Sequence, residues 1–247
     1  MNNKQPGKPV VQTVLSPALL NLYELNSSIV VIIDVLRATS TIATALHHGA
    51  KEIIPVATVA ECIQLGKQMD AITAGERDGK IAEGLQYGNT PSVYTPKFVG
   101  GKTVVLTTTN GTRLLHQALE ADAEEIITGA FCNLSSVCQY LVQRQKNVLL
   151  ACAAWRNRVN LEDTLFAGAV IDQIKDQFEI KGDSSQIAEI LYQEAKPGLF
   201  EYMKNKKASH YQRLMDQGLE ADIRYCLSVN SADTLPVYEN GRLAVRK

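Results

Sequence analysis

Residues 30–41 read V-V-I-I-D-V-L-R-A-T-S-T, an apolar run that stops at Asp34. Four consecutive aliphatic residues predict a strand that is buried on both faces, as strands of a parallel sheet are. Arg37 follows three positions after Asp34, and hydroxyl residues at 39–41 then open a helical pattern. Charged groups at the mouth of a buried strand are costly unless they are used, so this turn is a candidate site.

Other short apolar runs resemble the strand that ends at Asp34, and helical patterns separate most of them. This alternation predicts βαβ units and a mostly parallel sheet covered by helices, a three-layer α/β/α fold. The predicted buried strands cover residues 29–33, 52–56, 71–74, 103–107, 125–128 and 147–152.

The chain also resembles itself. Residues 31–57 (VIIDVLRATSTIATALHHGAKEIIPVA) align without a gap on residues 104–130 (VVLTTTNGTRLLHQALEADAEEIITGA), a constant shift of 73. Thr39 matches Thr112, and Glu-Ile-Ile recurs at both second strands. A second helix and a strand ending in arginine follow in each copy. We interpret this as an internal duplication, with a first α/β half at 1–101 and a second half plus a C-terminal extension at 102–247.

In open parallel sheets, ligands bind beyond the carboxyl ends of the strands, where helix N-termini offer free N–H groups. The repeat places 34–37 and 107–110 at equivalent turns, and the next strands end at Arg77 and Arg156. If the halves face each other, these polar turns line one cleft.

In the first turn, Asp34 is a candidate metal ligand or a nucleophile toward phosphorus, and the residues do not decide between the two. Arg37 is a candidate clamp for a phosphate group. The alternative is that Asp34 only caps the following helix.

The equivalent turn T-T-T-N-G-T-R at 107–113 suits an anion at a helix N-terminus, since Gly111 lets the backbone approach a ligand closely. Its candidate substrate-binding residues are Thr109, Asn110, Gly111 and Thr112. It lacks the P-loop spacing, and it could simply cap its own helix.

Two more segments are candidates. A-G-E-R-D-G at 74–79 and Y-G-N-T-P at 87–91 suit a substrate-covering loop, with Glu76 as a magnesium ligand and Arg77 and Asn89 as substrate contacts, although surface turns use the same residues. Glu162 and Asp163 open an apolar helix, where they either bind a metal, act as a general base, or only favour the helix dipole.

Composition limits the class of protein. The formal net charge of −1 over 247 residues gives no attraction to nucleic acid or an anionic membrane. Five scattered cysteines without a C-x-x-C pair argue against zinc and a disulfide framework. No signal peptide or membrane span is expected, which predicts a cytoplasmic protein. Only the general frequency of symmetric dimers favours a homodimer.

The combined motifs resemble the 2-phosphosulfolactate phosphatase family. The matching stretches, in the family's order, are D-V-L-R-A-T-S-T at 34–41, G-E-R at 75–77, G-N-T-P at 88–91, T-T-T-N-G-T at 107–112, L-E-D-T-L-F-A-G at 161–168 and S-H-Y-Q-R-L at 209–214.

The resemblance implies a Mg²⁺-dependent phosphoric monoester hydrolase that converts (R)-2-phospho-3-sulfolactate to 3-sulfolactate and phosphate on the coenzyme M route. Asp34, Arg37, Glu162 and Asp163 would be catalytic, Asp34 and Glu76 would hold the metal, and Arg156 would join the substrate contacts. Thr90 replaces the family's usual serine, and Trp155 occupies a position where the family usually has a small residue.

Two other functions remain open at this level. One is a phosphatase for another small phospho-hydroxy acid, which Trp155 could favour. The other is a non-catalytic anion-binding protein with the same cleft. The retained carboxylates count against the second, since anion binding alone would favour losing nearby negative charges.

Overall fold

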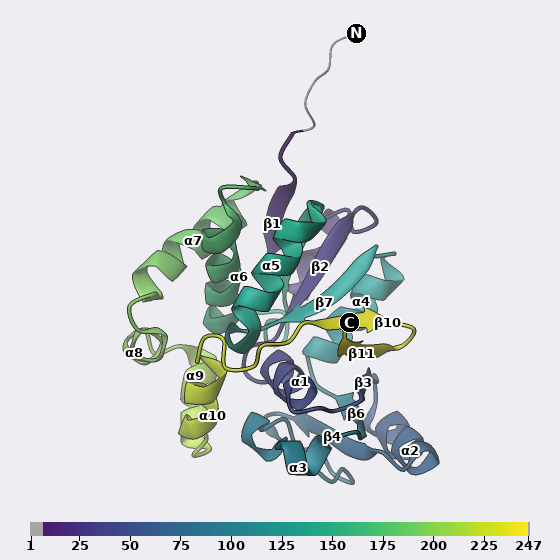
Figure 1. Cartoon of the computed structure of the whole chain (residues 1–247). Helices are drawn as coiled ribbons and strands as arrows, with labels where there is room; N and C mark the ends of the chain where they lie inside the picture. Colours follow the sequence, from purple (N-terminus) through teal and green to yellow (C-terminus); the bar gives the residue numbers. More distant parts are fainter. Residues whose placement is uncertain (1–6, 247) are drawn as a thin grey trace.

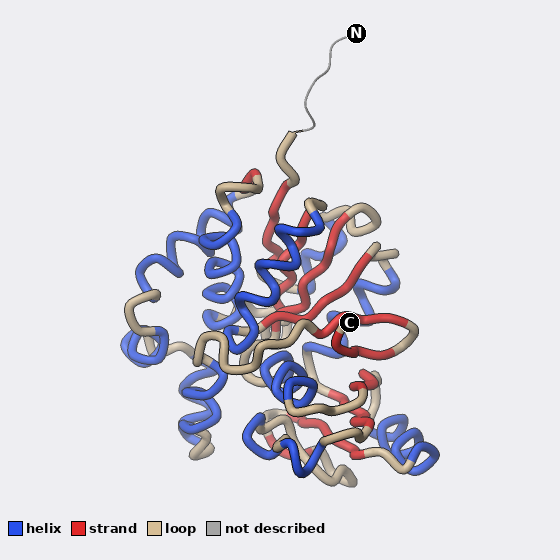
Figure 2. Tube along the Cα trace, in the orientation of Figure 1, coloured by secondary structure: helices blue, strands red, loops and turns tan. Residues whose placement is uncertain are grey.

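The structure is a computed structural model that describes residues 7–246. One large sheet runs through the molecule, with helices on both of its faces (Figures 1 and 2). The strands are β1 Val10–Val14, β2 Ser28–Ile33, β3 Glu52–Pro55, β4 Ile72–Arg77, β5 Lys80–Ile81, β6 Thr103–Thr107, β7 Glu125–Gly129, β8 Asn147–Cys152, β9 Glu179–Ile180, β10 Pro236–Glu239 and β11 Arg242–Val245. The α-helices are α1 Ala38–His47, α2 Val59–Met69, α3 Pro96–Val99, α4 Gly111–Glu120, α5 Leu134–Arg144, α6 Leu161–Ile174, α7 Asp183–Ala195, α8 Leu199–Asn205, α9 Ser209–Asp216 and α10 Glu220–Cys226. The 3₁₀ turns are η1 Pro17–Leu22, η2 Pro91–Val93 and η3 Phe131–Asn133.

The three-layer α/β prediction is confirmed, and the predicted buried strands correspond to β2, β3, β4, β6, β7 and β8. The strand order is β5-β4-β6-β3-β11-β10-β7-β2-β8-β1-β9. Strands β4, β6 and β3 are parallel to one another, and so are β7, β2, β8, β1 and β9. The antiparallel hairpin β10–β11 joins the two groups by pairing with β7 and β3.

The order shows an exchange between the two similar parts of the chain. Strand β2, the first strand of the first copy, lies between β7 and β8 of the second. Strand β6, the first strand of the second copy, lies between β3 and β4 of the first. Each parallel group is therefore built from both copies. The division of the chain at 101/102 stays a prediction about the sequence repeat.

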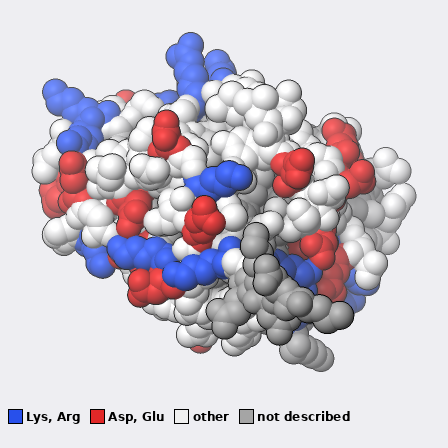
Figure 3. Space-filling view, turned by 90° about the horizontal axis from the view of Figure 1, so that it is seen from above, with Lys and Arg blue, Asp and Glu red and all other residues white. Residues whose placement is uncertain are grey.

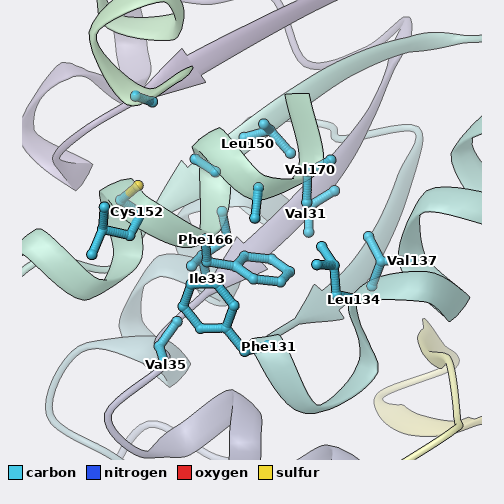
Figure 4. Close-up of a cluster of buried hydrophobic side chains, with 14 of the residues drawn as sticks. Val31, Ile33, Val35, Phe131, Leu134, Val137, Leu150, Cys152, Phe166 and Val170 are labelled. Carbon is cyan, nitrogen blue, oxygen red and sulfur yellow. The ribbon is translucent and has the colours of Figure 1, made fainter. Parts of the chain in front are cut away.

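The side chains of β2 alternate between two cores, because successive residues of a strand point to opposite faces. Val31 and Ile33 join the core beneath α5 and α6, where Phe131 and Phe166 meet edge to face with ring centroids 5.4 Å apart (Figure 4). Val30 and Ile32 join the core on the opposite face, together with residues of α1 and α4. Burial on both sides explains the uninterrupted apolar run before Asp34.

The surface carries both signs of charge. Lys and Arg side chains are interspersed with Asp and Glu side chains on the face shown in Figure 3. The five cysteines are buried and free. Within residues 7–246, we find no helix with the length and apolar character needed to cross a membrane.

Candidate active site

The carboxyl ends of the two parallel groups converge on one pocket of about 120 Å³. Residues after β2, β4 and β6 line it, and α9 adds a wall from the C-terminal part of the chain. The lining residues are Asp34, Leu36, Arg37, Glu76, Asp78, Gly79, Asn89, Thr109, Asn110, Trp155, His210, Arg213, Leu214 and Gln217.

Asp34 follows β2 directly, at the point where α1 approaches the pocket. Its backbone N–H donates to Thr39 Oγ1 at 3.1 Å, and the Thr39 N–H donates to its carbonyl oxygen at 2.9 Å. Burial and the nearby Glu76 carboxylate raise the pKa of Asp34 to about 6, against the opposing influence of His210. A carboxyl group with a raised pKa in a pocket is typical of a functional position.

Glu76 reaches the same pocket from the end of β4. Its Oε1 accepts the Thr109 N–H at 2.8 Å, and its Oε2 accepts the Gly79 N–H at 2.9 Å. Two backbone donors fix the orientation of this carboxylate. Glu76 therefore connects the strand ends of β4 and β6 and holds negative charge close to Asp34.

The turn after β6 is also closed by a threonine, but the N–H donor lies one position later than the equivalent of Asp34. The Thr108 N–H donates to Thr112 Oγ1 at 3.2 Å, and the Thr112 N–H donates to Thr108 Oγ1 at 3.1 Å. Thr112 is thus buried within the turn, whereas Thr109 and Asn110 line the pocket. Gly111 faces Asp34 so closely that a Cβ added to it would lie 2.9 Å from Asp34 Oδ2.

Arg37 lines the pocket, but protein partners occupy its guanidinium group. It forms a buried ion pair with Asp222 of α10, and it donates to Thr90 Oγ1 at 2.8 Å and to the Gly79 carbonyl at 3.0 Å. Thr90 Oγ1 also donates to Asp222 at 2.9 Å. Arg37 therefore ties α10 and the 79–90 loop to the first turn.

The other two predicted anion-binding arginines lie outside the pocket lining. Arg77 donates to the Glu76 carbonyl at 2.7 Å and to Thr107 Oγ1 at 3.0 Å, so it braces two strand ends. Arg156 is 63% exposed in its side chain and pairs with Asp78 at 3.2 Å. Both surround the site without facing its centre.

Asn89 belongs to the loop that follows β5 and lines the pocket. Its side chain is buried, and its Oδ1 has no hydrogen-bond partner among the described residues. The hydroxyl of Thr41 in α1 donates to its carbonyl oxygen at 2.6 Å. Thr109 Oγ1, also buried and without a partner, is a second free oxygen of the pocket wall. Oxygen atoms buried without partners are candidates for ligand contacts.

Glu162 and Asp163 open α6 side by side but differ in position. Glu162 Oε1 lies 2.6 Å from His210 Nδ1, and His210 lines the pocket. Asp163 instead accepts the Val35 N–H at 2.9 Å and the Ala154 N–H at 3.2 Å. Burial, Glu162 and Asp34 raise the pKa of Asp163 well above its usual range. Asp163 thus fastens the backbone after β2 to the backbone after β8.

Trp155, His210 and Arg213 also line the pocket, although they were not among the predicted site residues. Trp155 follows β8, and the guanidinium of Arg213 in α9 lies over its ring, 4.1 Å from the centroid. His210 and Arg213 are three residues apart on one face of α9, whereas Tyr211 and Leu214 are buried. The matching stretch S-H-Y-Q-R-L at 209–214 contained both polar residues, so the spacing on the helix was the available signal.

The predicted magnesium ligands Asp34 and Glu76 lie in the same pocket. Among residues 7–246, no three side chains of His, Cys, Asp or Glu are grouped so that they could hold a metal ion together. Mg²⁺ commonly takes only one or two carboxylates and keeps several waters. Two carboxylates with the free oxygens of Asn89 and Thr109 nearby fit that preference.

A pocket at the ends of parallel strands that gathers carboxylates, a histidine and arginines suits an enzyme of the phosphoric monoester hydrolase class. The family comparison makes this specific. Residues 14–241 match the model of the 2-phosphosulpholactate phosphatase family, and the chain belongs to that family.

Relatives from several bacteria are similar over most of their length, and each is named a probable 2-phosphosulfolactate phosphatase. The protein from Caldanaerobacter subterraneus subsp. tengcongensis is 39% identical over 235 residues, covering 94% of this chain and 96% of the relative. The Thermotoga maritima protein is 41% identical, with 85% and 89% covered. The protein from Picosynechococcus sp. is 40% identical, with 84% and 86% covered.

Proposed function

We propose that this pocket hydrolyses the phosphate ester of 2-phosphosulfolactate, releasing sulfolactate and inorganic phosphate. The observation that carries the proposal is the position of Asp34, which stands with a raised pKa where two helix N-termini and two strand ends converge. The names of the relatives supply the substrate.

The first requirement of the reaction is to hold a phosphoryl group and neutralise its oxygens. Helices α1 and α4 begin at Ala38 and Gly111, and a Cβ on Gly111 would lie 3.3 Å from the Cβ of Ala38. Their N-termini therefore lie close together beside Asp34, and each carries partial positive charge. The phosphate of the substrate would bind in the pocket next to Asp34, against Thr109 and Asn110 at the start of α4.

A divalent cation would complete the neutralisation. Asp34 and Glu76 would hold Mg²⁺, with Asn89 Oδ1 and Thr109 Oγ1 as neutral oxygen donors. When bound, Mg²⁺ would neutralise phosphoryl oxygens and act as a Lewis acid. Asp34 has two possible roles, ligation and attack on phosphorus, and Asp34 variants alone do not separate them.

The leaving alkoxide of the hydroxy acid needs a proton. His210 lines the pocket, and Glu162 holds its Nδ1 at 2.6 Å. A carboxylate on one ring nitrogen fixes the tautomer and orientation of an imidazole. We assign proton donation to His210 Nε2, with Glu162 as its positioning residue.

The remaining predictions concern the setting of the enzyme. Sulfolactate formed here would feed coenzyme M formation, as the family resemblance implies. The cytoplasmic location and the homodimer stay predictions, and the mixed surface charge gives no reason to add nucleic acid as a partner.

The test is phosphate release from racemic 2-phosphosulfolactate, measured with Mg²⁺ and with excess chelator. 2-Phospholactate, phosphoglycerate and an aryl phosphate are compared under the same conditions. We expect the largest kcat/KM for phosphosulfolactate and loss of turnover on chelation.

Two outcomes would replace the proposal. Turnover of other phospho-hydroxy acids without phosphosulfolactate would keep the reaction and change the substrate. Tight binding of sulfolactate without turnover of any ester, in folded protein with Mg²⁺, would establish an anion-binding protein.

A further inference from the structure

Arg213 differs from the other arginines around the pocket in how its charge is used. Arg37 pairs with Asp222, Arg77 donates to Glu76 and Thr107, and Arg156 pairs with Asp78. Arg213 lines the pocket, and the described residues 7–246 place no carboxylate within ion-pairing distance of it. Its Nη2 is buried and has no hydrogen-bond partner among them.

A buried donor of a guanidinium group without a partner is energetically costly. Burial lowers the pKa of Arg213 below its usual value, which reflects the same cost. An anion that enters the pocket would remove the cost by accepting the free N–H. The pocket thus contains an unused positive charge in addition to the helix N-termini next to Asp34.

Trp155 holds this charge in place. The guanidinium carbon of Arg213 lies 4.1 Å from the centroid of its ring, within the range of a cation–π interaction. The backbone of Arg213 is fixed as well, because Tyr211 and Leu214, its neighbours on α9, are buried. A guanidinium fixed on a ring presents its remaining donors in a defined plane, which suits the planar carboxylate or the three oxygens of a sulfonate.

We propose that Arg213, held over Trp155, binds the second anionic group of the substrate, a sulfonate or a carboxylate, and so selects esters that carry one. This inference rests on the proposed function for the identity of the ester. It assigns the phosphate to the helix N-termini near Asp34 and the distal anion to Arg213. Specificity and phosphate binding therefore depend on different residues.

The experiment compares Arg213→Gln with Arg213→Lys and with the wild type on three esters. 2-Phosphosulfolactate carries a sulfonate and a carboxylate, 2-phospholactate carries only the carboxylate, and an aryl phosphate carries neither. We expect Arg213→Gln to lower kcat/KM for phosphosulfolactate at least about tenfold, mainly through KM, and to leave the aryl phosphate within about twofold. Arg213→Lys should recover part of the loss.

The pattern across the esters identifies the group that Arg213 binds. A loss for phosphosulfolactate alone assigns the sulfonate, and a loss that includes phospholactate assigns the carboxylate. Both support the proposal. An equal loss for all three esters would overturn it, because Arg213 would then serve the phosphate or the fold.

Arg224 provides a matched control in α10. Its guanidinium lies 3.6 Å from the ring centroid of Phe200 and pairs with Glu220, but it does not line the pocket. Arg224→Gln should leave all three activities within about twofold. Trp155→Ala should raise KM for phosphosulfolactate about three- to tenfold, since it removes the cation–π support but keeps the charge.

Calorimetric binding of 3-sulfolactate and of inorganic phosphate separates this inference from the proposed function. Weaker binding of sulfolactate by Arg213→Gln, with unchanged phosphate binding, would support Arg213 even if the wild type hydrolysed no ester. Unchanged sulfolactate binding in the variant, or no sulfolactate binding by the wild type, would overturn it.

Discussion

The turn after β2 and the turn after β6 occupy equivalent positions in the duplicated sequence, yet they contribute different chemistry. Both are closed by a matched threonine: Thr39 Oγ1 accepts the Asp34 N–H at 3.1 Å, and Thr112 Oγ1 accepts the Thr108 N–H at 3.2 Å. At the strand end itself, the first turn has Asp34 and the second has Thr107. The closing threonine is shared, but its N–H donor changes from Asp34 to Thr108, one position beyond the equivalent Thr107, and only the first copy carries the carboxylate.

The equivalent positions at the two helix starts explain how the two turns fit together. Ala38 aligns with Gly111, and the two helix starts face each other, with Asp34 next to Gly111. A side chain on both helices would crowd the carboxylate. The second copy has Gly111 where the first has Ala38, and the missing methyl group leaves room for the Asp34 carboxylate.

The largest effect is expected from removing the negative charge of Asp34, which only the first turn carries. Asp34→Asn should lower kcat/KM for the phosphate ester at least about a thousandfold, whether Asp34 binds the cation or attacks phosphorus. Thr107→Ser, at the equivalent position, keeps its hydroxyl and should stay within about twofold. Steady-state phosphate release measures both, and a comparable loss in the two variants would mean that the turns are not functionally different.

The same substitution should change stability with pH. The pKa of Asp34 is raised from 3.8 to about 6, so the folded protein binds this proton more tightly than the unfolded chain. The contribution of Asp34 to stability is therefore lost as pH rises through 4 to 6, by about 2 to 3 kcal/mol. In chelator, Asp34→Asn should match the wild type near pH 4 and exceed its free energy of unfolding by that amount at pH 8. Denaturant unfolding at both pH values measures the difference, and a constant difference would contradict the assignment.

Adding the missing methyl group tests the packing between the turns. Gly111→Ala should lower kcat/KM about ten- to a hundredfold, because its Cβ would lie 2.9 Å from Asp34 Oδ2 and displace the carboxylate. Stability should change by less than about 1 kcal/mol, since the helix propensity of alanine offsets the strain. Adding Ala38→Gly should not restore activity, because the closest contact is with Asp34. Full activity in Gly111→Ala would show that Asp34 has room to move.

The smallest effect on the protein is expected from removing the threonine hydroxyl that closes each turn. Thr39→Val and Thr112→Val each remove a hydroxyl that accepts a buried backbone N–H, and each should cost about 1 to 2 kcal/mol. Denaturant unfolding should give the larger loss for Thr112→Val, because the Thr112 hydroxyl also donates to the Thr108 carbonyl at 2.8 Å. Equal losses would mean that this second hydrogen bond contributes nothing to stability.

The sequence was sufficient to predict the strands and the layers, because period and apolar runs are local signals. It did not predict that β2 lies between β7 and β8, since strand order depends on contacts between distant segments. The short strands β1, β5, β9, β10 and β11 were also missed. Strands β5, β9, β10 and β11 have only two to four residues and lie at the sheet edges or between the two groups, where the pattern is weak, whereas β1 has five residues and lies between β8 and β9.

The candidate site was predicted unevenly for a related reason. Asp34, Glu76, Thr109 and Asn110 were found because residues at the ends of parallel strands meet at one edge, and Asn89 was found from the polar loop at 87–91. The partners of the arginines could not be predicted, because Asp222 lies 185 positions from Arg37 in the chain. His210 and Arg213 reach the pocket on α9, whose position relative to the sheet has no local signature.

The exchange of β2 and β6 has a consequence for how the chain acquires its fold on the ribosome. Strand β2 (residues 28–33) is synthesised early, but its neighbours β7 and β8 are complete only when synthesis reaches residues 129 and 152. The apolar strand β2 therefore waits until residue 129 for its first partner and until residue 152 for its second, and exposed strand edges of this kind favour aggregation. Nascent chains stalled before residue 125 should depend on chaperones, whereas chains released after β8 should not.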